Sequence, residues 1–213
     1  MSRILWWAGG AAAAAVVGRN VLARAQAGEC PYPPVGLPPL PRTREETIRR
    51  IHARIVEANP GLDVPLCAAG RSCALVVAGA LAMAEGWQLP PDLVTAIAWR
   101  ESRFNLHVDN IRERIEAGRE IGPLQVRPIA FRDVGMDPAA MINMPMPARI
   151  QYAVGAGLAY LELLRTRYLP GASWCSILHA YNVGPTAYRA GRRNQGYVND
   201  VISQARRYSE LRA

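Results

Sequence analysis

The sequence predicts a mainly helical single domain preceded by an N-terminal extension. Apolar side chains recur at helical spacing along much of the chain, and few stretches alternate as a half-buried strand would. No internal repeat is visible, and half of the 213 residues are hydrophobic, which is enough for one ordinary buried core. We expect residues 1–27 to be a signal peptide, 28–62 a connector with one helix, and 63–213 the domain.

The first residues have the layout of a secretory signal peptide. Arg3 precedes an apolar run from Ile4 to Val17, and small residues at 23, 25 and 27 offer cleavage sites. The run is shorter than the about 20 residues of a membrane span. The sequence therefore predicts a periplasmic protein, with an uncleaved membrane anchor as the lesser alternative.

The four cysteines lie outside this segment, and an even number in an exported chain predicts disulfides, with three possible connectivities. Cys67 and Cys73 are close in sequence and form the natural pair, which leaves Cys30 for Cys175. A zinc site is the alternative, but the three histidines lack ligand spacing. We expect no metal and no cofactor.

Six prolines between positions 31 and 41 predict an extended connector, and the helices follow it. The run from Thr43 to Glu46 has the pattern of a capping box, which opens an amphipathic helix that ends near Pro60. A buried helix is expected over 73–84, and Pro91 opens the next one. Further helices are expected over 147–168, 173–181 and 197–208, with loop or extended structure over 122–126.

Glu101 is the most informative residue of the chain. Val94, Ile97 and Ala98 precede it by seven, four and three residues, which places all four side chains on one stripe of a helix. A carboxyl group on a core-facing stripe is costly to ionise, so such a Glu can donate a proton near neutral pH. The alternative is a helix-end Glu that faces solvent.

Three segments in order carry a family resemblance: Glu101-Ser102-Arg103-Phe104-Asn105, Gly122-Pro123-Leu124-Gln125 and Ala180-Tyr181-Asn182-Val183-Gly184. They resemble the catalytic domain of soluble lytic transglycosylases, whose pattern is Glu-Ser-x-Phe-Asn, Gly-Leu-Met-Gln and Ala-Tyr-Asn-x-Gly. Weaker echoes are Gly155 to Leu161, similar to Gly-x-x-Tyr-Leu, and Tyr197-Val198-x-x-Val201. The resemblance implies a lysozyme-like fold with a small β-region beside the catalytic Glu.

The resemblance also implies an activity and its residues. Glu101 would be the acid and base that cleaves the MurNAc–GlcNAc bond of peptidoglycan and forms a 1,6-anhydro end. The other residues implied in substrate binding or in shaping the site are Ser102, Asn110, Gly122, Gln125, Tyr181 and Asn182. Asn110 enters only by its offset, because the family's Asn-Pro-x-Ala-x-Ser stretch is replaced here, and the gap up to Gly122 is long and charged.

Two other functions stay open. A lysozyme-type hydrolase would need a second carboxylate, from Asp109 or a Glu of the inserted segment 106–121. A non-catalytic wall-binding factor would keep the fold without turnover. The small size resembles family members that serve conjugation or type IV or type III secretion machines. We expect a monomer that binds glycan strands, and the net charge of +8, all from arginine, shows no pattern of nucleic-acid binding.

Overall fold

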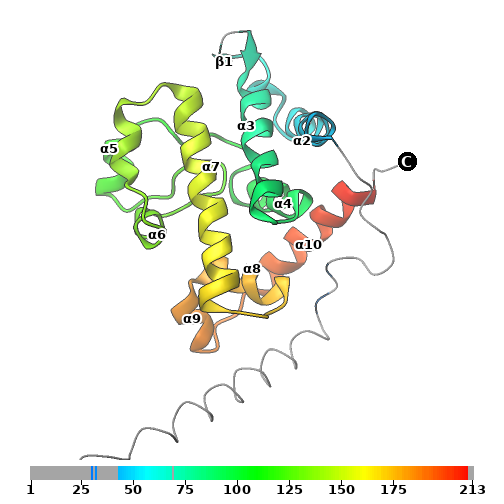
Figure 1. Cartoon of the computed structure of the whole chain (residues 1–213), viewed down its shortest axis with the longest axis vertical. Coiled ribbons are helices and arrows are strands. Elements are labelled where there is room, and N and C mark those ends of the chain that lie inside the picture. Colours follow the sequence, from blue (N-terminus) through cyan, green and yellow to red (C-terminus); the bar gives the residue numbers. More distant parts are fainter. Residues whose placement is uncertain (1–29, 31, 33–42, 69, 211–213) are drawn as a thin grey trace, which may run out of the picture.

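The computed structural model of the protein describes residues 30, 32, 43–68 and 70–210. The expected signal peptide and most of the proline-rich connector lie outside these residues. The described part is mainly helical and lysozyme-like, which is the fold class that the sequence predicts (Figure 1). No helix of the described part is both long and apolar enough to cross a membrane.

Helix α2 (Arg44–Ala58) begins where the capping box predicts it. Thr43 is the N-cap, and its hydroxyl accepts a hydrogen bond of 3.2 Å from the backbone N–H of Glu46. Ile51 and Ile55 on its apolar face are buried in the common core. The helix therefore packs on the domain, against α3 and α4, and is followed by the short 3-10 helix η1 (Pro60–Leu62).

A two-stranded hairpin precedes the next helix and lies at one end of the molecule. Strands β1 (Leu66–Ala68) and β2 (Arg71–Ser72) are antiparallel, and the Cys67–Cys73 disulfide closes the hairpin onto α3 (Cys73–Leu81). Helix α3 is buried nearly all round, as its continuous apolar sequence predicts, and passes into the 3-10 helix η2 (Ala82–Trp87).

Helix α4 (Pro91–Ser102) carries Glu101 in its last turn and lies at the centre of the fold (Figure 1). The stripe formed by Val94, Ile97 and Ala98 is buried, as predicted. After Ser102 the chain turns sharply, with positive φ at Arg103 and Phe104, and the Phe104 ring is fully buried. This turn redirects the chain away from the helix axis, so Glu101 stands where α4 ends and a cleft can open.

The segment between α4 and the long helix α7 contains three short helices that the sequence analysis did not predict. They are α5 (Ile111–Glu116), α6 (Pro128–Asp133) and the 3-10 helix η3 (Pro138–Asn143). Between α5 and α6 a single antiparallel bridge joins Ile121 to Val126. This bridge is the only β pairing outside the Cys67–Cys73 hairpin in the described part of the chain.

Helix α7 (Met146–Leu163) runs along the domain and ends in a π-helical turn, η4 (Leu164–Tyr168), close to the predicted span. It packs against α3 on one side and α6 on the other (Figure 1). Ile150, Val154, Leu158 and Leu161, the predicted apolar side, are all fully buried. The Gly122–Val126 loop packs directly against this helix.

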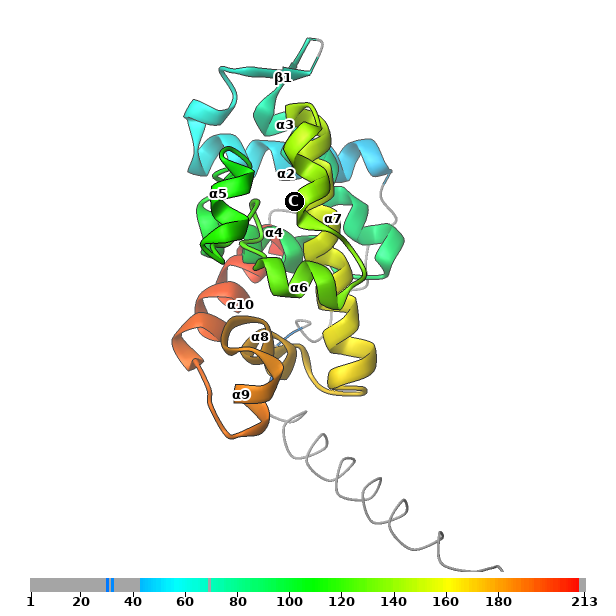
Figure 2. The same ribbon diagram turned by 90° about the vertical axis from the view of Figure 1, so that its left-hand side faces the viewer.

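Of the last three helices, two lie at the end opposite the hairpin, and the third runs from that end back to the middle of the molecule (Figures 1 and 2). They are α8 (Trp174–Val183), α9 (Pro185–Arg189) and α10 (Gln195–Glu210). Helix α10 packs along α4 and also contacts α8. The Cys30–Cys175 disulfide, the second pairing that the sequence favours, fastens the N-terminal part of the chain to the first turn of α8.

Candidate active site

Glu101 faces a cleft of about 710 Å³ between the end of α4, the Gly122–Val126 loop, α6 and the α8–α9 corner. Its Oε1 accepts a hydrogen bond of 2.7 Å from the hydroxyl of Tyr197 on α10. The side chain is partly buried, because its helix stripe faces the core while its end reaches the cleft. The carboxyl group is thus held by protein on one side and open to a ligand on the other.

The surroundings of Glu101 favour its protonated form. Burial raises the pKa of Glu101 most, since a charge is poorly solvated there, and the nearby Glu120 raises it further. The Tyr197 hydrogen bond and the charge of Arg100 lower it, but the pKa stays above the ordinary value of 4.5. A proton is therefore retained to higher pH than on an exposed Glu, as a general acid requires.

The Gly122–Val126 loop is fixed to α4 through Ser102. The buried Ser102 hydroxyl lies 2.8 Å from the carbonyl oxygen of Pro123 and 3.1 Å from that of Ala98. The bridge between Ile121 and Val126 closes the base of the loop. Ser102, expected among the substrate-binding residues, does not line the cleft in the described structure; it holds the loop that does.

Gly122 is required for packing. A Cβ at this position would lie 2.6 Å from the Cβ of Ala153 on α7, and the backbone φ of +78° is unfavourable for other residues. The family resemblance implies a role for this glycine in substrate binding or in shaping the site; it faces α7 and is absent from the residues that line the cleft. The glycine lets the loop sit directly on α7.

Gln125 is the loop residue that reaches the cleft. It has a φ of +50°, and its side-chain Nε2 donates a hydrogen bond of 2.7 Å to the carbonyl of Gly122. This bond consumes one of its two N–H groups and leaves the rest of the amide for a ligand. Gln125 and Glu101 therefore line the same cleft, as the sequence analysis expected.

Tyr181 and Asn182 come from the end of α8 and also line the cleft. The Tyr181 hydroxyl donates a hydrogen bond of 2.6 Å to the carbonyl of Leu124, so it supports the same loop, and its ring packs against that of Tyr160 at 5.9 Å. Burial raises the pKa of Tyr181 well above its ordinary range, and it stays a neutral donor. Asn182 is exposed, and its Oδ1 accepts a bond of 2.8 Å from Asn194.

Tyr197 is a site residue that the sequence analysis did not assign. It was noted only as part of a Tyr-Val-x-x-Val echo, yet its hydroxyl is the direct hydrogen-bond partner of Glu101. The Tyr-Val-x-x-Val pattern marked this tyrosine, but its role depends on the packing of α10 along α4, which brings Tyr197 to the end of α4 and which the pattern does not show.

Asn110 lies elsewhere. It is the N-cap of α5 and borders a separate hollow of about 440 Å³ with Ile142 and Arg149. The offset from Phe104 predicted a binding role, but the segment 106–121 folds into its own short helix and carries Asn110 out of the cleft. Asp109 is also outside the cleft, with its carboxylate 3.6 Å from Arg114.

Glu120 lines the cleft as a second glutamate, and Asp133 on α6 also lines it. The Oε1 of Glu120 accepts a hydrogen bond of 2.9 Å from Nε of Arg127, and both residues line the cleft with Glu101. Glu120 belongs to the inserted segment 106–121, whose glutamates were expected, with Asp109, as candidates for the second carboxylate of a hydrolase. Its position just before the Ile121–Val126 bridge is what brings it to the cleft wall.

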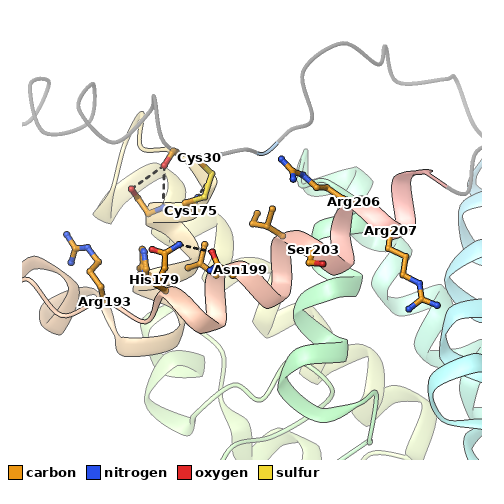
Figure 3. Close-up of a pocket in the computed structure, with 13 residues that line it drawn as sticks. Cys30, Cys175, His179, Arg193, Asn199, Ser203, Arg206 and Arg207 are labelled. Atoms are coloured by element: carbon orange, nitrogen blue, oxygen red, sulfur yellow. Dashed lines mark hydrogen bonds between the residues drawn. A yellow bond between two sulfur atoms is a disulfide. The ribbon is translucent and has the colours of Figure 1, made fainter.

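A second cavity, of about 800 Å³, lies between the start of α8 and the face of α10, next to the Cys30–Cys175 disulfide (Figure 3). Polar and basic side chains surround it, among them His179, Arg193 and Asn199. The described residues that line it include no carboxylate, so it offers no acid for glycosidic chemistry. The Glu101 cleft is therefore the candidate active site.

The described residues hold no cluster of three or more His, Cys, Asp or Glu side chains that could bind a metal ion.

In comparisons with known proteins, the family model for the transglycosylase SLT domain matches residues 80–202, more than half of the chain. No curated protein and no solved structure matches the chain. Domains of this family are lytic transglycosylases that act on peptidoglycan, which lies outside the cytoplasm. The matched span contains Glu101, Gln125, Tyr181 and Tyr197, and the chain belongs to the transglycosylase SLT domain family.

Proposed function

We propose that the protein is an exported lytic transglycosylase in which Glu101 is the only acid and base of the reaction. The observation that carries this proposal is the state of Glu101: a partly buried carboxyl group, open to a cleft, with its pKa raised by burial. A general acid needs a retained proton and access to the leaving oxygen, and the raised pKa of Glu101 and its place in the wall of the cleft support both.

The reaction has two steps. In the first, Glu101 gives its proton to the glycosidic oxygen, the bond from that oxygen to the anomeric carbon of MurNAc breaks, and positive charge develops on the sugar ring. In the second, the 6-hydroxyl oxygen of the same sugar bonds to the anomeric carbon and its proton passes to the Glu101 carboxylate. The acid is regenerated, no water is consumed, and the product ends in 1,6-anhydroMurNAc. Because the nucleophile belongs to the substrate, its effective concentration is high.

The cleft residues around Glu101 fit a polysaccharide. Gln125 and Asn182 present amide groups that can donate and accept hydrogen bonds, as sugar hydroxyl and N-acetyl groups require. Tyr181 supports the loop and lines the same wall. We propose Gln125, Tyr181 and Asn182 as substrate-binding residues. Gly122 and Ser102 act through the position of the loop.

We propose that the protein works in the periplasm as a monomer. Two disulfides support an oxidising compartment, since such bonds persist outside the reducing cytoplasm. The signal-peptide pattern of residues 1–27 gives the route of export. Service to a conjugation or type IV or type III secretion machine is part of the proposal and rests on the small size of the domain alone.

Hydrolysis is the second candidate, and Glu120 is the observation that favours it. A hydrolase of the lysozyme type uses two carboxyl groups, and Glu120 lines the cleft together with Glu101. The two reactions differ in whether water or the 6-hydroxyl group attacks the anomeric carbon, so their products differ in mass by one water.

The proposal is tested by Glu101→Gln, with Glu116→Gln as the matched control. Glu116 is an exposed carboxylate of α5 that does not line the cleft, so its substitution makes the same chemical change outside the site. Release of muropeptides from purified sacculi should fall by about 10²–10⁴-fold or more in Glu101→Gln and stay at the wild-type rate in Glu116→Gln. Near-normal release of muropeptides by folded Glu101→Gln would show that Glu101 is not the acid of the reaction.

A further inference from the structure

We propose that Glu120 is the electrostatic partner of Glu101: a second carboxylate in the same cleft whose negative charge favours the protonated form of the acid. The inference rests on the proposed function, since it needs Glu101 to be that acid. Glu120 acts by its charge, on the acid and on the positive charge of the reacting sugar, and not as a base for water.

The loop architecture places the two carboxyl groups in one cleft. Glu120 immediately precedes the bridge that joins Ile121 to Val126, and the loop closed by this bridge is fastened to α4 by Ser102, the residue after Glu101. The position of Glu120 is therefore fixed relative to the end of α4. Both carboxyl groups line the cleft as a result.

Two arginines hold Glu120 in its ionised form. Arg127 donates the 2.9 Å hydrogen bond to the carboxylate, and Arg114 donates one of 3.2 Å to the backbone carbonyl of Glu120. Burial alone would raise the pKa of Glu120, but its own backbone N–H, Arg127 and Arg114 together bring it below the ordinary value. The pKa values of the two glutamates of the cleft are thus shifted in opposite directions, a division typical of acid–base sites.

Several charged or titratable groups surround Glu101, and their effects can be separated. Burial and Glu120 favour its protonated form, while Tyr197 and Arg100 favour its ionised form. Tyr181, on α8, also faces Glu101 and stays neutral. The remaining charged residues that line the cleft are Arg127, Asp133, Arg192 and Arg193. Glu120 is the acidic group whose charge raises the pKa of Glu101, and its effect is smaller than those of burial, Tyr197 and Arg100.

The fixed charge also suits the reaction. Positive charge develops on the sugar ring as the glycosidic bond breaks, and a negative group already fixed in the wall of the cleft favours such charge. Glu101 becomes negative only after it has given up its proton. Glu120 carries its charge before that step, so its field is present when the bond begins to break.

The test compares Glu120→Gln with Glu120→Asp and with the control Glu116→Gln. Two quantities are measured: the pH dependence of kcat/KM on soluble glycan strands, and the NMR titration of the Glu101 side-chain carboxyl carbon, assigned with Glu101→Gln. Removal of the negative charge should lower the pKa of Glu101. We expect both the alkaline limb of the profile and the titration midpoint to shift to lower pH in Glu120→Gln. Glu120→Asp and Glu116→Gln should titrate as the wild type.

Unchanged titration of Glu101 in folded Glu120→Gln would overturn the proposal. Glu120→Ala also removes the negative charge, without adding an amide group. If Glu120→Gln is unstable, the titration of Glu101 in Glu120→Ala is measured in its place. Wild-type products with reducing ends that disappear in Glu120→Gln would also overturn it, because Glu120 would then activate water. The NMR titration does not depend on turnover, so a fully active Glu101→Gln would refute the proposed function without deciding the role of Glu120.

Discussion

The hydroxyl of Tyr197 donates a 2.7 Å hydrogen bond to Oε1 of Glu101, across 96 positions of the chain. Tyr197 is only 2% exposed, held by the packing of α10 along α4. The bond fixes one carboxyl oxygen and leaves the other for the cleft. The C-terminal helix is therefore part of the candidate site and positions its acid.

Tyr197→Phe should weaken this arrangement in a measurable way. The hydrogen bond lowers the pKa of Glu101, so its loss should raise that pKa and move the alkaline limb of the activity profile to higher pH, opposite to the shift expected for Glu120→Gln. The lost bond should also lower the free energy of unfolding by about 1 kcal/mol. Tyr208→Phe, a buried tyrosine on the same helix but outside the cleft, is the control. An unchanged profile in Tyr197→Phe would contradict this role.

Glu101→Gln should alter stability in a pH-dependent way. The pKa of Glu101 is raised in the folded protein, so its contribution to stability is fully present below about pH 4.5 and is lost as the pH rises through the folded pKa. A neutral amide has no such dependence. The variant should therefore gain stability relative to the wild type as the pH increases over this range, as urea unfolding at several pH values would measure. A relative loss with rising pH would mean that the carboxylate is stabilised by the fold.

Gly122→Ala should destabilise the domain by about 2–5 kcal/mol, the sum of backbone strain at positive φ and overpacking against Ala153. Gly118→Ala is the matched control, because Gly118 has a φ of +63° with no atom within 4 Å of the added Cβ. It should cost only the backbone strain, about 1–2 kcal/mol. Adding Ala153→Gly to Gly122→Ala should recover part of the loss. Equal costs at the two glycines in thermal unfolding would contradict the packing argument.

The two disulfides should contribute unequally to stability. Cys30–Cys175 spans 145 positions and Cys67–Cys73 only 6. On the chain-entropy model these loops correspond to about 5 and about 2 kcal/mol. Replacing the Cys30–Cys175 pair by alanines should therefore lower the midpoint of urea unfolding more than replacing the Cys67–Cys73 pair. The reverse order would contradict the chain-entropy model. It would show that the Cys67–Cys73 bridge stabilises the folded hairpin directly, in addition to restricting the unfolded chain.

Local patterns predicted much of the fold. The capping box set the start of α2, and the apolar spacing of Val94, Ile97 and Ala98 placed Glu101 on a buried stripe. These features depend on residues a few positions apart, which sequence shows directly. The small β-region expected beside Glu101 is only the Ile121–Val126 bridge, and the two-stranded sheet lies in the Cys67–Cys73 hairpin.

The parts that could not be predicted depend on contacts between distant segments. Tyr197 meets Glu101 only because α10 packs on α4. Asn110 and Glu120 both belong to a charged segment that resembles a solvated loop, yet one caps α5 away from the cleft and the other lines it. The two residues differ because Asn110 precedes α5 and Glu120 precedes the bridge that joins Ile121 to Val126. Neither feature can be found by counting residues from Phe104.

The mass of the released glycan ends tests the central claim most directly. Muropeptides released from purified sacculi by the mature, oxidised protein would be analysed by mass spectrometry, with Glu101→Gln as the inactive control. A single acid and base at Glu101 predicts 1,6-anhydroMurNAc ends, lighter than hydrolysis products by one water, and none from the control. Reducing MurNAc ends as the main product would contradict the account and assign the cleft to a hydrolase.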